Sequence, residues 1–160
     1  MRVYLSGPMS GLTPKQASGW REKTTKQLVD AGFEVADPMR GTEKLHSGRK
    51  KLRPDKYPEN EPSLSDKAFV QRDKFDVKRS DIILVNLLGA PERSVGTICE
   101  IAFNMVFGNL CVIAMEEKNV HNHPFIREGG VIFNNLDGAV KYVLSCAVDK
   151  PNGDEDEGGE

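Results

Sequence analysis

An apolar run, a short loop and a helical stretch follow one another near the middle of the chain and constrain its fold more than any other feature. The run is Ile82–Leu87, the loop is Gly89–Arg93, and the helical stretch is Ser94–Ala102. A strand, a polar turn and a helix in this order build ligand sites, because a helix start offers unpaired backbone N–H groups and a partial positive charge. The sequence therefore predicts a site for a phosphate or another anion at Ser94.

The helical stretch carries an apolar stripe and one carboxylate outside it. The members of the stripe recur at helical spacing and are predicted to face the sheet. They are Ile98, Ile101, Ala102 and Met105. Glu100 falls outside the stripe and should look over the carboxyl edge of the sheet, where open α/β folds bind ligands. The alternative is that Ser94 only caps the helix and that Glu100 is solvated.

The other segments alternate between strand-like and helix-like patterns. The predicted strands are Arg2–Ser6, Phe33–Ala36, Ile82–Leu87, Leu110–Met115 and Val131–Phe133. The predicted helices are Pro14–Ala31, Asp66–Arg79, the stretch after Ser94, and Leu136–Val148. This order predicts an α/β fold, a single-domain three-layer sandwich with a mostly parallel, five-stranded sheet of the Rossmann or flavodoxin-like kind. Right-handed crossovers would place the loops after the first three strands on one edge.

The predicted domain spans residues 1–148, and two segments differ from the rest in composition. Residues 39–65 are basic and contain prolines, which predicts a long, lid-like loop; the alternative is a solvated run of charge. Residues 149–160 are acidic and predict a disordered tail. The net charge is −2, and five acidic residues lie from Pro151 onward, so the rest of the chain is about +3. This excess allows an anionic small ligand but does not indicate nucleic-acid binding.

The cysteines and the hydropathy pattern indicate a compartment. The chain has three cysteines without a CxxC pair, namely Cys99, Cys111 and Cys146. This usage favours buried free thiols in a reducing cytoplasm over a disulfide or a zinc site. No apolar run is long enough to cross a membrane, and the chain begins directly with a strand-like segment, so no signal peptide is expected. The sequence thus predicts a cytoplasmic protein.

Two further groups belong to the predicted edge of the sheet. The turn after the first strand allows the backbone to approach a ligand closely, or it is a simple connection. It consists of Gly7, Pro8, Met9, Ser10 and Gly11. Asp37 ends the second strand, where it either contacts a ligand or shapes the turn before Pro38.

A carboxylate beside an anion-binding helix start suits glycosyl transfer, whose transition state resembles a cation. We assign Glu100 as the nucleophile that would hold a covalent sugar, and Asp73 as the acid that manages the proton of the leaving group. Tyr4 on the first strand could hydrogen-bond to a carboxylate and orient it. Asp73 and Asp76 lie near one helix face, so spacing alone does not separate them.

Together these residues resemble the nucleoside 2-deoxyribosyltransferase family, and in particular its branch of 2'-deoxynucleoside 5'-monophosphate N-hydrolases. The resemblance lies in Tyr4–Gly7, in Asp73 ahead of Asp81, and in the segment Ser94–Glu100. It covers roughly residues 1–147 without the basic loop. It implies that the glutamate is the nucleophile, that Asp73 assists the base and its proton, and that Tyr4 positions the nucleophile.

Ser94 separates the branches of this family. The transferases typically carry an aspartate at this place, which binds the 5'-hydroxyl of the sugar, whereas the hydrolases carry a serine, which binds the 5'-phosphate. A hydroxyl at a helix start accepts a phosphate that a carboxylate would repel. The resemblance therefore implies a small nucleotide substrate, no nucleic-acid or membrane partner, and no cofactor or metal. The expected substrate contacts are Ser6, Gly7, Pro8, Met9, Ser10, Gly11, Asp37, Ser94, Gly96 and His123.

Two features depart from the family pattern. The turn after the first strand lacks the arginine that the hydrolase branch often shows, and the basic loop could supply that charge instead. The family also completes its site with a residue of a neighbouring subunit, which implies a homodimer or a higher homo-oligomer. Our alignment places His123 there; the alternatives are a surface histidine and, less favoured, a metal pair with His121.

The sequence thus predicts an enzyme that cleaves the N-glycosidic bond of (deoxy)nucleoside 5'-monophosphates through a covalent glycosyl-glutamate intermediate. The products would be free base and sugar phosphate. The nearest alternative is a 2-deoxyribosyltransferase that passes the sugar to another base. A phosphoribohydrolase of the cytokinin-activating type shares Gly96-Thr97-x-x-Glu100, but the PGG that precedes this segment there is missing here. A non-catalytic nucleotide-binding module on the same fold is the alternative of a different class.

Overall fold

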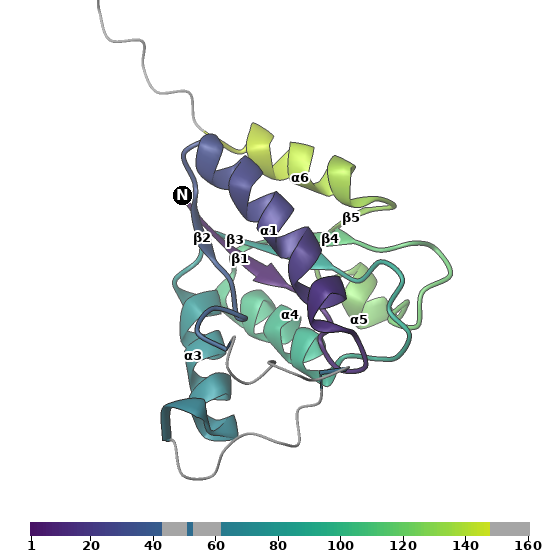
Figure 1. The fold of residues 1–160 in the computed structure, drawn as a ribbon. Helices are drawn as coiled ribbons and strands as arrows, with labels where there is room; N and C mark the ends of the chain where they lie inside the picture. Colours follow the sequence, from purple (N-terminus) through teal and green to yellow (C-terminus); the bar gives the residue numbers. More distant parts are fainter. Residues whose placement is uncertain (43–50, 53–61, 148–160) are drawn as a thin grey trace, which may run out of the picture.

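A five-stranded, all-parallel sheet lies at the centre of the computed structural model (Figure 1). Its strands are β1 (Arg2–Ser6), β2 (Glu34–Ala36), β3 (Ile82–Asn86), β4 (Leu110–Ala114) and β5 (Val131–Phe133), in the order β2-β1-β3-β4-β5. The predicted α/β fold is confirmed. The structure describes residues 1–42, 51–52 and 62–147, so the predicted tail 149–160 and most of the predicted loop 39–65 lie outside the described residues.

Helices cover both faces of the sheet and complete three layers (Figure 1). The helices are α1 (Pro14–Asp30), α3 (Asp66–Lys78), α4 (Val95–Phe107), α5 (Pro124–Arg127) and α6 (Leu136–Ser145), with a short 3₁₀ turn, η1 (Pro62–Leu64), before α3. One core cluster joins the sheet to α1 and α6 through Leu28 and Val140. The other joins it to α3 and α4 through Val77 and Ile101. Helix α5 was not predicted from the sequence, because four residues are too few to show helical periodicity.

Strand β1 lies between β2 and β3, so it is paired on both edges, and its residues from Val3 to Ser6 are buried. Its register pairs Tyr4 with Ile83 and Ser6 with Val85 of β3. Alternate residues of a strand point to opposite faces of the sheet. Tyr4 and Ser6 therefore share the face that α3 and α4 cover, whereas Leu5 packs under α1 and α6. This alternation places two hydroxyl groups beneath α4.

Helix α4 buries a different face from the one that its apolar stripe predicts. The buried residues are Thr97, Glu100, Ile101 and Asn104. The prediction is wrong for Ala102, which is exposed, and for Met105, which is 46 % exposed. Hydrogen bonds satisfy most of these buried polar groups. The Asn104 side-chain nitrogen donates to the carbonyl oxygen of Asn109 at 2.9 Å, whereas Oδ1 of Asn104 has no partner within the described residues.

The three cysteines all lie within the described residues and are free thiols. Cys111 is buried in β4, and its burial raises the pKa of the thiol to about 12. Cys99 is exposed, so the prediction that it is buried is wrong: it points away from the sheet on α4. None of the helices in the described residues is long and apolar enough to cross a membrane. Cytoplasmic localisation stays a prediction.

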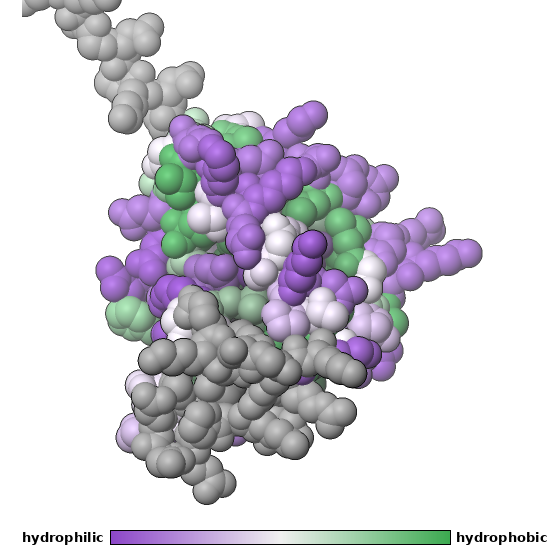
Figure 2. All heavy atoms as spheres, in the orientation of Figure 1, coloured by the Kyte–Doolittle hydropathy of each residue, from purple (hydrophilic) through white to green (hydrophobic). Residues whose placement is uncertain are grey.

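The surface around α1 is mostly hydrophilic in the described part of the chain (Figure 2). Helix α1 begins with a capping box, in which Thr13 and Gln16 each bond the backbone N–H of the other. Its buried residues include Ala17, Leu28 and, unusually, Arg21, which has no exposed surface. A fully buried arginine needs partners, and its partners lie at the turn after β1.

Candidate active site

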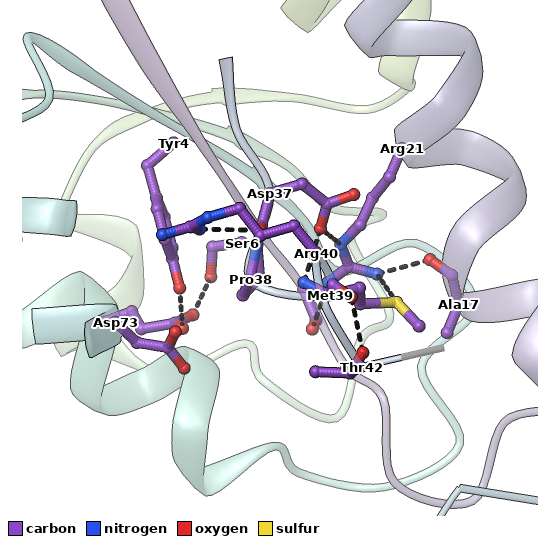
Figure 3. A network of polar contacts seen from close by, with 12 residues as sticks. Tyr4, Ser6, Ala17, Arg21, Asp37, Pro38, Met39, Arg40, Thr42 and Asp73 are labelled. Carbon is purple, nitrogen blue, oxygen red and sulfur yellow. Dashed lines mark hydrogen bonds and ion pairs between the residues drawn. The ribbon is translucent and has the colours of Figure 1, made fainter. Parts of the chain in front are cut away.

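Glu100 lies at the bottom of the candidate site, on the second turn of α4, and is 9 % exposed. The hydroxyl of Tyr4 donates a hydrogen bond of 2.6 Å to Oε1 of this carboxylate, and the hydroxyl of Ser6 donates to Oε2. Figure 3 shows the Tyr4 and Ser6 side chains pointing the same way, with Asp73 beside their tips. Two donors from one strand therefore fix both oxygens of the carboxylate.

The turn after β1 passes so close to β3 that only glycine fits at its start. A Cβ atom on Gly7 would lie 2.8 Å from the carbonyl oxygen of Asn86 and 3.1 Å from the Trp20 ring. The carbonyl oxygen of Gly7 accepts a hydrogen bond of 2.8 Å from the buried guanidinium of Arg21. That guanidinium also lies 4.6 Å from the Trp20 ring centroid and 3.7 Å from the Asp37 carboxylate. Arg21 thus holds the turn in place from behind.

The two carboxylates of α3 that spacing does not separate have different surroundings. Asp73 lines the same cavity as Glu100, and its nearest cation is Arg72, at 3.5 Å. Asp76 is not among the described residues that line that cavity, and its side chain is 4 % exposed. It is ion-paired to Arg2 at 3.2 Å and also to Arg40. Geometry therefore favours Asp73 over Asp76 as the second carboxylate of the site.

A cavity of about 460 Å³ opens over these groups. The described residues that line it come from the turn after β1, from the end of β2, from α3 and from the start of α4. They are Gly7, Pro8, Met9, Ser10, Pro38, Asp73, Glu92, Arg93, Ser94, Val95, Gly96, Thr97 and Glu100. The loops after the first three strands thus meet at one edge of the sheet, as right-handed crossovers require.

Ser94 begins α4 and also lines the cavity. Its side-chain oxygen accepts hydrogen bonds from the backbone N–H of Thr97 at 3.4 Å and from the Thr97 hydroxyl at 3.0 Å. The backbone N–H groups of Val95 and Gly96 precede the first bond within the helix, which runs from Ile98 to Ser94 at 3.1 Å. The cap and the open N–H groups together face the cavity, where they suit an anion.

Burial shifts the ionisation of the site. It raises the pKa of Glu100 to about 7, although the hydrogen bonds from Ser6 and Tyr4 act in the opposite direction. It raises the pKa of Asp73 to about 6, partly offset by the charge of Arg72. Burial, and next the charge of Glu100, hold the pKa of Tyr4 well above its usual range, so its phenol stays a donor. The two carboxyl groups therefore can hold one proton near neutral pH.

Four of the expected substrate contacts, Ser6, Gly11, Asp37 and His123, do not line the cavity as far as the described residues form it. Gly11 lies beside Glu92, whose carboxylate oxygen is 3.4 Å from where a Cβ would stand. Asp37 accepts a hydrogen bond of 2.8 Å from the backbone N–H of Met39 and faces Arg21. His123 is exposed, stacks on Phe125 and lines a separate apolar cavity. Ser6 is fully buried, and its hydroxyl is engaged by Glu100.

Sequence reasoning missed several residues at the site. Arg21 carries no motif, because a charge on an amphipathic helix predicts an exposed residue. Its position one turn after Ala17, on the buried side of α1, was the available signal. Pro38, Glu92 and Thr97 flank predicted site residues in the sequence and reach the cavity with them.

The arrangement combines a buried carboxylate held by two hydroxyl donors, a second carboxyl group nearby and an anion-accepting helix start. A carboxylate of this kind can attack an electron-poor carbon or stabilise a cation. A neighbouring carboxylic acid can donate a proton to a leaving group. The helix start can hold a negatively charged group of the same substrate.

Comparisons with known proteins find the same fold in several solved structures. No protein-family model and no curated protein matches the sequence. Among solved structures, the CMP N-glycosidase BcmB of Clostridium botulinum is 18 % identical with a TM-score of 0.57, over 89 % of this chain and 97 % of that one. A 2-deoxyribosyltransferase of Bacillus psychrosaccharolyticus is 13 % identical with a TM-score of 0.61, over 90 % and 96 %.

A conserved protein of Enterococcus faecalis V583 is 15 % identical with a TM-score of 0.50, over 89 % of this chain and 87 % of that one. Identities this low show a shared fold and nothing finer. The resemblance that the motifs predict is therefore confirmed at the level of the fold. The chain has the fold of a CMP N-glycosidase and of a 2-deoxyribosyltransferase along nearly its whole described length.

Proposed function

We propose that the protein is an N-glycosidase that hydrolyses (deoxy)nucleoside 5'-monophosphates to free base and sugar phosphate. The proposal rests on one observation. Tyr4 and Ser6 donate hydrogen bonds to the two carboxylate oxygens of Glu100, and Glu100 lines the same cavity as Ser94. A fold shared with a CMP N-glycosidase supports it. The aspartate of α3 that lines this cavity, Asp73, supplies the second carboxyl group.

The reaction divides into two steps. In the first, an oxygen of Glu100 bonds to the anomeric carbon while the glycosidic C–N bond breaks. Its electron pair goes to the base, which takes the proton of Asp73. In the second, the Asp73 carboxylate takes a proton from water as the water oxygen bonds to the same carbon. As this bond forms, the bond to Glu100 breaks, its electron pair returns to the Glu100 carboxylate, and sugar phosphate leaves. Tyr4 and Ser6 hold the nucleophile in line throughout.

The proton has to be on Asp73 for the first step. In the empty site burial raises the pKa of both carboxyl groups, to about 7 for Glu100 and about 6 for Asp73, so the two groups compete for a proton near neutral pH. The developing positive charge of the sugar stabilises an ionised Glu100 next to it and thereby favours the proton on Asp73.

The 5'-phosphate would bind at the start of α4, next to the Ser94 hydroxyl and the N–H groups of Val95 and Gly96. Arg93 lines the same part of the cavity and adds a positive charge. A base-exchanging 2-deoxyribosyltransferase is the second candidate, because the same covalent intermediate can pass its sugar to a base. The shared fold with a 2-deoxyribosyltransferase favours it specifically.

We also propose that the protein works as a homodimer. The outer face of α4 and the adjacent α5 expose apolar side chains: Met105 is 46 %, Val106 82 % and Phe125 74 % exposed. A cavity of about 540 Å³ on this face holds His123, and Arg93 lines both this cavity and the candidate active site. A second copy seated here would reach the edge of the active site. Phe125→Asp should convert the dimer to a monomer in light scattering; a monomeric wild-type protein would refute the dimer.

A substrate panel tests the function. Wild-type protein should release free base from nucleoside 5'-monophosphates and far less from nucleosides, measured by chromatography with and without an acceptor base. Glu100→Gln should lower turnover by at least about 10⁴-fold while nucleotide binding stays measurable, because the nucleophile is lost and the cavity is kept. Turnover that survives in this variant would exclude Glu100 as the nucleophile, and a new nucleoside formed from the acceptor base would favour the transferase.

The role of Ser94 has its own test. Ser94→Asp should abolish or reverse the preference for monophosphates, because a carboxylate at the helix start repels the phosphate. Ser94→Thr, which keeps a hydroxyl cap, is the matched control. Equal rates on nucleosides and monophosphates in the wild-type protein would contradict the assignment of Ser94.

A further inference from the structure

His121 is a buried histidine that the proposed chemistry does not use. It lies in the loop between β4 and α5 and is 2 % exposed. Its Nε2 accepts a hydrogen bond of 2.8 Å from the backbone N–H of Ser94, the residue that begins α4. A ring nitrogen can accept from an N–H group only while it carries no proton. The contact therefore requires the proton of the ring to be on Nδ1.

The other ring nitrogen leads to the same tautomer independently. Nδ1 lies 3.0 Å from Oδ1 of Asn119, which also accepts the backbone N–H of His121 at 2.8 Å. The Asn119 amide nitrogen donates to the carbonyl oxygen of Leu87 at 2.7 Å, and this fixes which end of the amide is the oxygen. Oδ1 is thus an acceptor, and Nδ1 must donate to it. Burial, and next the charge of Arg93, lower the pKa of His121, which keeps the ring neutral.

These bonds fasten the loop that leads into α4 to the loop that follows β4. The Arg93 side chain donates to the carbonyl oxygen of Val120 at 2.9 Å, and the backbone N–H of Gly89 donates to the Glu116 carboxylate at 3.0 Å. His121 is the member of this set that bonds Ser94 itself. Its ring accepts a hydrogen bond from the backbone N–H of Ser94. Ser94 lines the candidate active-site cavity, whereas His121 is not among the described residues that line it.

We propose that His121 is a positioning residue for phosphate binding: its neutral, Nδ1-protonated ring fixes the backbone of Ser94 and thereby aims the Ser94 hydroxyl and the first turn of α4 at the 5'-phosphate. The proposal rests on the proposed function for its substrate. It predicts a selective effect, because His121 touches neither the sugar-binding carboxylates nor the turn after β1. Losing the contact should weaken phosphate binding and leave the reacting groups in place.

Kinetics of two His121 variants test the proposal. His121→Leu removes the acceptor and should raise KM for a nucleoside 5'-monophosphate on the order of tenfold, with kcat and the KM of the matching nucleoside little changed. His121→Gln can place an amide oxygen near the position of Nε2 and should restore most of the lost affinity. An equal rise of KM for the nucleoside, or a glutamine variant as poor as the leucine variant, would overturn the proposal.

Asn122→Ala is the matched control, because it removes hydrogen bonds within the same loop without touching Ser94. The Asn122 amide donates to the carbonyl oxygen of Glu117 at 2.7 Å and accepts from Arg127 at 2.6 Å. This variant should keep the wild-type KM for the monophosphate. If it raises KM as His121→Leu does, the loop acts as a whole and the specific role of His121 is refuted.

Nuclear magnetic resonance separates a failure of this inference from a failure of the proposed function. Nitrogen-15 shifts of the His121 ring in the ligand-free protein should show a protonated Nδ1 and an unprotonated Nε2, and the opposite tautomer would overturn the inference. If the wild-type protein cleaves no nucleotide, titration with inorganic phosphate replaces the kinetics. Phosphate should then shift the N–H signals of Val95 and Gly96, with affinity lower in His121→Leu and restored in His121→Gln; equal affinities in all three proteins would refute it.

Discussion

Asp73 and Asp76 lie one turn apart on α3, yet the structure treats them in opposite ways. Asp76 is 4 % exposed and is ion-paired to two arginines, one at the start of β1 and one after β2. Asp73 is 19 % exposed and faces the cavity. Its arginine neighbour, Arg72, also donates to the carbonyl oxygens of Pro38 and Arg40. Asp73 thus shares its only ion-pair partner within the described residues.

The difference shows how one helix can carry a carboxylate held in ion pairs and a carboxylate that we propose to be reactive. Two arginines form ion pairs with Asp76 and join α3 to β1 and to the segment after β2. Asp73 has one ion-pair partner within the described residues where Asp76 has two, and burial raises the pKa of Asp73 to about 6. A carboxyl group that gains and loses a proton near neutral pH can serve as an acid or a base. Sequence spacing cannot reveal this difference, because the compensating arginines come from distant segments.

The largest expected effect is on turnover. Asp73→Asn should lower kcat for a nucleoside 5'-monophosphate by about 10²–10³-fold, because the proton donor is lost at nearly constant shape. Asp76→Asn should leave kcat within roughly threefold, because Asp76 does not line the cavity. Steady-state kinetics on both variants decide the matter. A larger loss in Asp76→Asn than in Asp73→Asn would reverse the assignment of the two residues.

The next effect is on stability as a function of pH. The folded-state pKa of Glu100 is raised from 4.5 to about 7, so its stabilising contribution is present below pH 4.5 and is lost as pH rises through 7. Glu100→Gln should therefore be more stable than wild type by on the order of 3 kcal/mol at pH 8, with little difference at pH 4.5.

Urea denaturation at both pH values measures this difference. Glu117→Gln is the control, because Glu117 is exposed and its substitution should change stability equally little at both pH values. A Glu100→Gln variant that is no more stable than wild type at pH 8 would show that burial of the ionised Glu100 carboxylate does not destabilise the fold.

The smallest expected effect concerns the ion pairs of Asp76. Asp76→Ala should lower the free energy of unfolding by about 2 kcal/mol, less than for a fully buried pair, because Arg2 and Arg40 are partly exposed and can be resolvated. Asp30→Ala, which breaks an exposed ion pair with Lys26 on α1, should cost only about 0.5 kcal/mol or less. Equal losses in the two variants would mean that Asp76 contributes no more than a surface charge.

The fold could be predicted because each strand is a short apolar run with turn residues at its ends. The parallel order then followed from the intervening helices. Tyr4 and Glu100 were predictable as partners because Tyr4 lies on the first strand and Glu100 follows the start of a helix at the carboxyl edge of the same sheet. The structure brings them to 2.6 Å.

The remaining features depend on contacts between distant segments. The burial of Arg21 depends on the Gly7 carbonyl and on Asp37, and the role of His121 depends on the backbone of Ser94. Neither contact leaves a periodic pattern in the sequence. The buried face of α4 was predicted only in part, because polar residues share it with Ile101 and hydropathy alone does not select polar residues for burial.

Ser94 caps α4 and Glu100 lies within the same helix, so the geometry of the helix fixes the distance between these two residues. Six residues of α-helix advance about 9 Å along the axis and turn through roughly 600°. The separation between the proposed anion site and the proposed nucleophile is therefore set by the helical pitch and not by the conformation of a loop. One residue inserted between them would swing the carboxylate about 100° around the axis and away from β1, so evolution can vary the walls of this cavity far more freely than its span.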